Sequence, residues 1–98
     1  MLVTVLYDPT LQEVAGRREE VLTLRDVDTL ADLLEVIAAT YTAARPYLYP
    51  TGAIRKTDPT LHFLINGRRA RGLAGLQTPL RPQDMVEIIA IPPMVGGG

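Results

Sequence analysis

The alternation of hydrophobic and polar positions predicts two strands near the start of the chain. Residues 1–7 (MLVTVLY) are rich in β-branched side chains and alternate around Thr4, as a strand with one buried face does. Residues 21–27 (VLTLRDV) predict a second strand, paired with the first as a hairpin. Between them, Asp8-Pro9 and Gly16 favour a turn or loop.

The hydrophobic period then changes to that of a helix over residues 28–46. Its apolar stripe consists of Leu30, Leu33, Leu34, Ile37 and Tyr41. Thr29 and Asp32 have the spacing of a capping box, and Arg45 before Pro46 marks the expected end of the helix.

Two more strand signals follow. Residues 61–71 predict a hairpin, since Asn66-Gly67 supplies the two positive-φ residues of a type I′ turn. Residues 85–91 predict the last strand. The stretch 47–60 is expected to be a loop, and residues 72–84 a polar connection anchored inward by Leu73, Leu76 and Leu80.

The predicted order is therefore β-β-α-β-β-β. One amphipathic helix needs one apolar sheet face, which predicts an α+β domain with a mixed sheet of four to five strands covered by one main helix. That order is the one used by β-grasp folds. We expect one domain over residues 1–91 and a flexible tail over residues 92–98.

Composition excludes several classes of function. A net charge of −1 gives no reason to expect nucleic acid or an anionic membrane as a partner. The chain has no signal-peptide pattern and no apolar run long enough to span a bilayer, so we expect a cytoplasmic protein. It contains no Cys, no Ser and one His, so we predict no metal site and no catalytic nucleophile with its base: the chain is not an enzyme by itself.

The most unusual segment is the end of the chain. Pro92-Pro93 fixes φ and favours an extended exit, and Met94 and Val95 lead to Gly96, Gly97 and Gly98. Backbone without Cβ atoms can enter a narrow channel. The tail is thus interpreted as the working part of the molecule, with a frayed terminus as the alternative.

The element order, the hairpin FLINGRRA, the turn PLRPQDMV and the end IPPMVGGG together resemble the MoaD/ThiS family, and MoaD more than ThiS. The resemblance implies a ubiquitin-like β-grasp sulfur carrier that binds no cofactor itself. An E1-like enzyme of the MoeB/ThiF kind adenylates the terminal glycine with ATP, and a sulfur donor converts it to a thiocarboxylate. The acceptor would be a MoaE-like large subunit of molybdopterin synthase, in molybdenum cofactor biosynthesis. Thiamine, cysteine and tRNA thiolation remain alternative pathways.

Two positions depart from the family pattern. Counted from Pro92-Pro93, the family's Gly-Gly falls on Gly96-Gly97, which leaves Gly98 as an additional residue. The family commonly has glycine where this chain has Gln83, so the turn before the last strand is expected to differ.

Strand alternation also predicts a partner-binding patch. Val86, Ile88 and Ala90 are expected to face the helix, as are Leu61, Phe63 and Ile65. The opposite face would then carry Leu64, Ile89 and Ile91 as an exposed apolar patch beside the tail. Arg68 and Arg69 add positive charge, as a partner contact or a solvated face. His62, on the same face, is expected to have no role as a ligand or base.

The rival hypothesis is a ubiquitin-like modifier whose terminal glycine forms an isopeptide bond with lysines of target proteins. Both hypotheses use the same activated glycine, so the tail does not separate them.

The number of lysines in the chain provides one test between the carrier and the modifier. Nine of the ten basic residues are arginine, which keeps its proton and is not an amine nucleophile, and Lys56 is the only lysine. For a carrier, we expect no polymer when the chain is activated in excess sulfur donor. Self-conjugates seen on denaturing gels and lost in Lys56→Arg would contradict the carrier hypothesis and favour the modifier.

Overall fold

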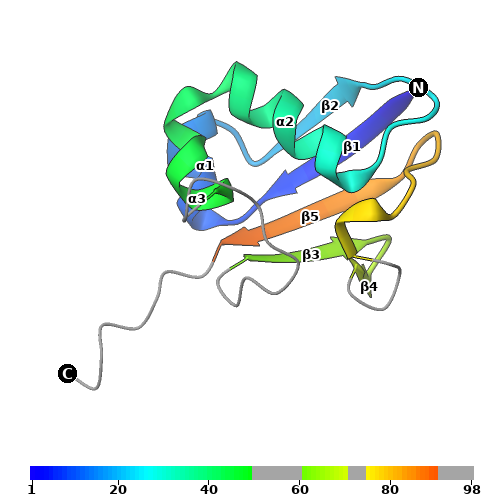
Figure 1. Cartoon of the computed structure of the whole chain (residues 1–98). Coiled ribbons are helices and arrows are strands. Elements are labelled where there is room, and N and C mark those ends of the chain that lie inside the picture. The colour runs from blue at the N-terminus through cyan, green and yellow to red at the C-terminus, as the bar shows by residue number, and fades with distance from the viewer. Residues whose placement is uncertain (50–60, 71–74, 91–98) are drawn as a thin grey trace.

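The computed structural model describes residues 1–49, 61–70 and 75–90. Within these ranges it has a five-stranded sheet in the order β2-β1-β5-β3-β4 with the main helix across one face (Figure 1). The strands are β1 (Leu2–Tyr7), β2 (Glu19–Thr23), β3 (Leu61–Ile65), β4 (Arg68–Arg69) and β5 (Met85–Ala90). The helices are α1 (Pro9–Ala15), α2 (Leu30–Thr40) and α3 (Arg45–Leu48), with 3-10 turns η1 (Thr42–Ala44) and η3 (Gly75–Gln77).

The sheet is mixed, and the last strand lies in its middle. β1 pairs antiparallel with β2, and β5 pairs parallel with β1 on one side and antiparallel with β3 on the other. This arrangement confirms the predicted α+β fold with one sheet and one main helix.

α2 forms where the sequence predicts it. Thr29 and Asp32 make the reciprocal capping box, and the stripe residues Leu30, Leu33, Leu34 and Ile37 are buried. The helix ends earlier than expected, at Thr40, with Tyr41 as its C-cap. Arg45 does not end this helix but begins α3, where Pro46 lies in the first turn and costs no hydrogen bond.

The predicted loop after the first strand is wrong, because these residues form α1. Asp8 is its N-cap and accepts a hydrogen bond from the Leu11 backbone N–H, Pro9 lies in the first turn, and Gly16 closes the helix at φ 73°. These are the start and stop signals of a short helix. Leu11 anchors α1 in the core at 1% exposure. The second strand, predicted at residues 21–27, accordingly begins and ends earlier, as β2.

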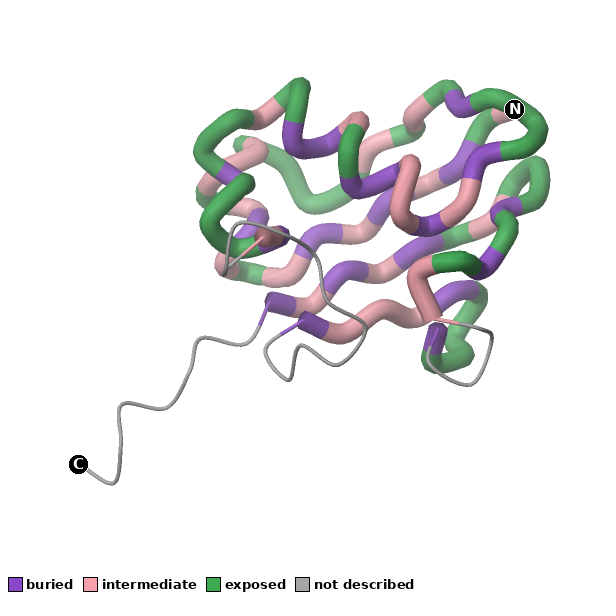
Figure 2. Tube along the Cα trace, viewed as in Figure 1, coloured by how far each residue is buried: buried purple, intermediate pink, exposed green. Residues whose placement is uncertain are grey.

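The core lies between the sheet and the helices, and buried positions alternate along the strands (Figure 2). Val86, Ile88 and Ala90 are buried, and so are Leu61 and Ile65, while Phe63 is partly buried against the same cluster. The predicted facing of β3 and β5 is thereby confirmed. Of the predicted inward anchors, Leu80 is buried and Leu76 is partly buried, while Leu73 and the loop from residue 50 to 60 lie outside the described residues.

The Asn66-Gly67 turn is confirmed, with φ angles of 52° and 83°. Its side chain also holds the neighbouring turn, because Asn66 Nδ2 donates to Asp84 Oδ1 at 2.8 Å and Asn66 Oδ1 accepts from Met85 N at 2.9 Å. In that neighbouring turn Gln83 has a φ of 69°, and its backbone N–H donates to the Leu2 carbonyl at 2.7 Å. Glutamine thus adopts the left-handed conformation that glycine adopts freely.

We expect Gln83→Gly to stabilise the domain by about 0.5–1 kcal/mol, because relief of the left-handed strain exceeds the added entropy of the unfolded chain. Chemical denaturation measures this change. Asn66→Gly is the matched control: it relieves similar strain but removes two hydrogen bonds, so it should destabilise. A loss of stability in Gln83→Gly would contradict the strain argument.

Candidate functional site

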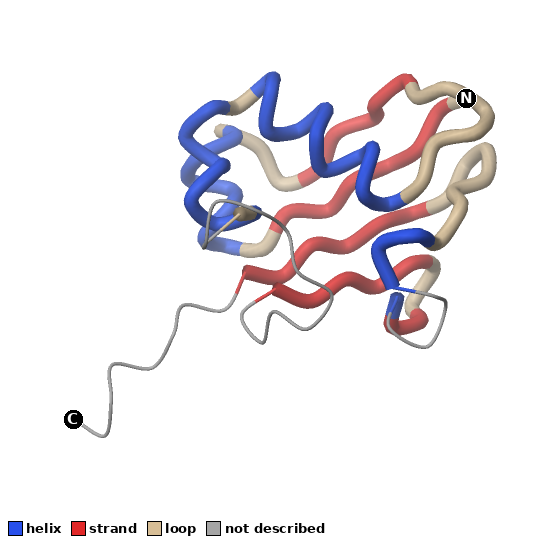
Figure 3. The backbone as a smooth tube through the Cα atoms, viewed as in Figure 1, coloured by secondary structure: helices blue, strands red, loops and turns tan. Residues whose placement is uncertain are grey.

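The sheet face opposite the core is the main candidate surface. Figure 3 shows the strands as one layer with the helices gathered on one side. In β5 the residues that point away from the helices are Met85, Glu87 and Ile89, which alternate with buried positions. We call this side of the sheet the outer face.

The centre of the outer face is a carboxylate between two leucines. Glu87 is opposite Leu64 on β3 and beside Leu6 on β1, and Ile89 is opposite His62. Leu64 and Ile89 are half-buried rather than fully exposed, because their neighbours in the sheet cover part of each side chain. These two residues of the predicted patch are therefore on the expected face but are less exposed than the sequence indicates.

The two predicted basic residues differ in their position. Arg69 is paired with Leu64 and so shares the outer face with it, whereas Arg68 is paired with Ile65, whose side chain points to the core side. Both arginines are exposed, at the edge of the sheet. The two-residue Asn66-Gly67 turn fixes this register, which assigns only Arg69 to the candidate surface.

More exposed apolar side chains lie at the other end of the same face. Leu2, Val21 and Met85 are 55%, 59% and 46% exposed, and the paired residue Thr4 lies between Val21 and Met85. The patch predicted from the sequence does not include these three residues. Alternation along the first strand contains the signal for Leu2, and alternation along the second contains the signal for Val21, which is opposite Thr4.

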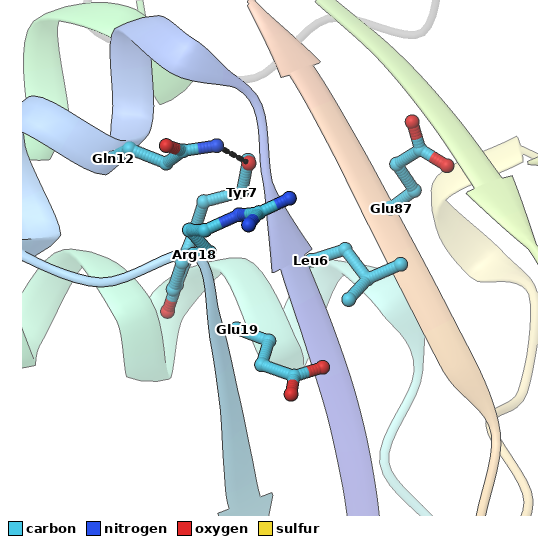
Figure 4. Close-up of a pocket in the computed structure, with 6 residues that line it drawn as sticks. All are labelled: Leu6, Tyr7, Gln12, Arg18, Glu19 and Glu87. Atoms are coloured by element: carbon cyan, nitrogen blue, oxygen red, sulfur yellow. Dashed lines mark hydrogen bonds between the residues drawn. The ribbon is translucent and has the colours of Figure 1, made fainter.

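A shallow depression opens at the rim of the outer face, where β1 meets the segment before β2. It is lined by Leu6, Tyr7, Gln12, Arg18, Glu19 and Glu87 (Figure 4). The Gln12 side-chain amide donates to the Tyr7 carbonyl at 2.9 Å and so fixes one wall. The Arg18 side chain extends across β1 on the side from which Glu87 projects, which brings both charges into one opening.

On the core side, one carboxylate joins the end of α2 to the sheet. The Tyr7 and Tyr41 hydroxyls both donate to Glu20 Oε1, at 2.9 and 2.8 Å. Burial, followed by the hydrogen bond to Glu20, raises the pKa of both phenols. The phenols therefore stay protonated near neutral pH, and the cluster is a structural link.

The predicted working end of the chain is outside the described residues. This applies to Ile91, to Pro92, Pro93, Met94, Val95, Gly96, Gly97 and Gly98, and also to Lys56. The described chain leads to that segment through Ala90, the last residue of β5. In the described part of the molecule, no helix has both the length and the apolar character needed to cross a membrane.

One family model matches nearly the whole chain. A model of the ThiS family matches residues 5–98, which includes the tail. Small archaeal modifier protein 1 from Methanosarcina acetivorans is 28% identical with a TM-score of 0.77, over 99% of this chain and 96% of that one. No curated protein matches the sequence.

Two more distant structures share the fold. A putative molybdopterin converting factor, subunit 1, from Pyrococcus furiosus is 20% identical with a TM-score of 0.74, over 93% of this chain and 98% of that one. The BexX/CysO complex from Amycolatopsis orientalis contains a chain 14% identical with a TM-score of 0.70, over 91% of this chain and 94% of that one.

Adjacent residues of β3 test the assignment of the faces. Leu64→Asp should lower the free energy of unfolding by about 1 kcal/mol, because the Leu64 side chain is only half-buried. The new carboxylate would be repelled by Glu87 on one side and attracted by Arg69 on the other, so these two effects oppose each other. Ile65→Asp should cost more than about 3 kcal/mol, since it places a charge in the core. Urea denaturation compares the two, and equal losses would mean that the outer face is part of a buried surface.

Proposed function

Since the chain belongs to the ThiS family of ubiquitin-fold sulfur-carrier proteins, we propose that it carries sulfur as a thiocarboxylate on its C-terminal glycine. The observation that supports this most is the family match that extends to Gly98, on a chain whose last described strand leads directly to the glycine tail. The protein is then a co-substrate, working in the cytoplasm, and catalysis belongs to its partners.

The chemistry has two steps. The terminal carboxylate attacks the α-phosphorus of ATP in an E1-like, MoeB/ThiF-like enzyme, which forms an acyl-adenylate and releases pyrophosphate. A hydrosulfide supplied by the sulfur donor then attacks the carbonyl carbon; the bond to the AMP oxygen breaks, and AMP and a proton leave. The product is the thiocarboxylate. Both ATP and the sulfur donor belong to the activating partner.

The tail suits this role for physical reasons. A carboxylate is a poor acyl donor until it is adenylated, so the end of the chain must enter another protein's nucleotide site. Glycine has no Cβ atom and therefore allows close approach of its backbone. Pro92-Pro93 restricts the chain ahead of the glycines, which lowers the entropy lost when the tail is ordered.

We assign partner recognition to the outer face. Leu64 and Ile89 offer apolar contact, and Arg69, which is paired with Leu64, offers a charge at the rim. Apolar contact surrounded by polar groups is the common composition of a protein interface. After sulfur loading, the same face would meet the acceptor, for which a MoaE-like large subunit of molybdopterin synthase is our first candidate. The fold similarity to a putative molybdopterin converting factor subunit supports this choice.

A second function has its own support, because the small archaeal modifier protein 1 is 28% identical over nearly the whole chain. In that case the acyl-adenylate is consumed by a lysine amine of a target protein, and an isopeptide bond forms. The two functions differ in the nucleophile that meets the activated carbonyl. Intact mass after incubation with the activating enzyme, ATP and a sulfur source separates them: replacement of one oxygen by sulfur supports the carrier, and high-mass conjugates support the modifier.

Deletion of Gly97 and Gly98 tests the terminus. We expect the shortened chain to lose ATP-dependent activation completely, because the acyl group no longer reaches the nucleotide. Its thermal melting temperature should stay within about 1 °C of the natural chain, since glycines without side chains bury little apolar surface. Retained pyrophosphate release would contradict the proposed terminus, and a large drop in melting temperature would show that the tail is packed.

A further inference from the structure

Asp8 connects the start of α1 to the last strand. Its Oδ1 accepts from the Leu11 backbone N–H at 2.8 Å, which caps the helix. Its Oδ2 accepts from the Ala90 backbone N–H at 2.7 Å, although the two residues are 82 positions apart. One carboxylate therefore holds both the beginning of a helix and the end of the strand that leads to the tail.

The geometry of the parallel ladder explains why a side chain is used here. The Asp8 backbone N–H continues the β1–β5 pairing by donating to the Ile88 carbonyl at 3.2 Å. In a regular ladder the next bond would run from Ala90 to the Asp8 carbonyl. That carbonyl instead accepts from Gln12 N at 2.8 Å, as the first bond of α1. The Asp8 side chain thus takes the ladder position that its own backbone has left.

This contact matters because Ala90 is only 5% exposed, so water does not readily replace a lost partner. A buried backbone N–H without an acceptor is costly, and the strand end would shift to find one. Downstream, Pro92 and Pro93 have no backbone N–H to donate to a neighbouring strand.

We propose that Asp8 is a positioning residue for activation: by holding Ala90, it fixes the end of β5, from which the sequence continues to its terminal glycine. This role rests on the proposed function of the terminus. A tail that starts from a fixed strand end loses less entropy when the glycines enter the nucleotide site. Asp8 acts through Ala90 and does not touch the reacting carboxylate.

A single substitution separates this role from helix capping. Asparagine is as good an N-cap as aspartate, so the side-chain oxygen in Asp8→Asn keeps the hydrogen bond from the Leu11 N–H. Its NH₂ group then faces the Ala90 N–H, and because both groups are donors, that hydrogen bond is lost. Asp8→Ser also caps a helix with one oxygen and should behave in the same way. The matched control is Asp32→Asn in the α2 capping box, where Asp32 Oδ2 accepts from Thr29 N at 2.8 Å. The start of α2 lies towards the other end of the sheet from the end of β5 (Figure 1).

Two measurements are made on the full chain. Amide hydrogen exchange should show faster exchange at Ala90 in Asp8→Asn and unchanged protection at Leu11. In ATP–pyrophosphate exchange with the E1-like enzyme, we expect Asp8→Asn to lower kcat roughly two- to tenfold, which corresponds to the entropy of ordering one or two additional groups. The KM for this protein should not change, because the outer face is intact. Asp32→Asn should leave both readouts at the level of the natural chain.

The outcomes are distinguishable. If the natural chain is adenylated and Asp8→Asn matches it in kcat while Ala90 has lost protection, the positioning role is wrong and the proposed function stands. A raised KM with unchanged kcat would make Asp8 a partner contact instead. If Asp32→Asn lowers kcat by the same factor, the loss in Asp8→Asn reflects lower stability of the domain and the positioning role is wrong. A natural chain that is not adenylated by any E1-like partner contradicts the proposed function itself, and the role of Asp8 with it.

Discussion

The parallel pairing of the first strand with the last is the interaction on which the rest of the fold depends. β5 has neighbours on both sides, so its backbone groups are satisfied by β1 and β3 together. Parallel neighbours need a long crossover, and here the crossover carries the helix that covers the sheet. The strand that leads to the chain end is thereby the most enclosed one. Under the proposed function, the tail would start from the strand at the centre of the sheet.

The two faces of the sheet differ in how much apolar surface they bury. The core side contains nearly all of the buried apolar volume, supplied by α2 and by alternate strand residues. The outer face has apolar side chains that are only partly covered, with Glu87 among them. A central carboxylate limits the size of any continuous apolar patch, which reduces self-association. It also favours a partner that places a donor over that position, so the charge contributes selectivity more than affinity.

The two proposed functions, carrier and modifier, differ in the second reactant. Both proposals require the same acyl-adenylate, and its fate would depend on whether hydrosulfide or a lysine amine reaches it first. With one lysine in the sequence, the chain itself offers few competing amines. Under the proposed function, the described structure contributes an outer face for a partner and a strand end held by Asp8, and the partner supplies the chemistry.

Sequence alone determined the features that arise from local physics. The 3.6-residue stripe and capping box defined α2, Asn66-Gly67 defined the hairpin turn, and strand alternation gave the facing of β3 and β5. Local signals for α1 were also present, in Asp8, Pro9 and Gly16, but the same residues are common in turns, and only burial of Leu11 decides between the two. Tertiary structure alone decided the rest. The partial cover of Leu64 and Ile89 follows from their neighbours in the sheet. The bond from Asp8 to Ala90 joins residues 82 positions apart, and no local pattern contains it, because it exists only once the first and last strands lie side by side.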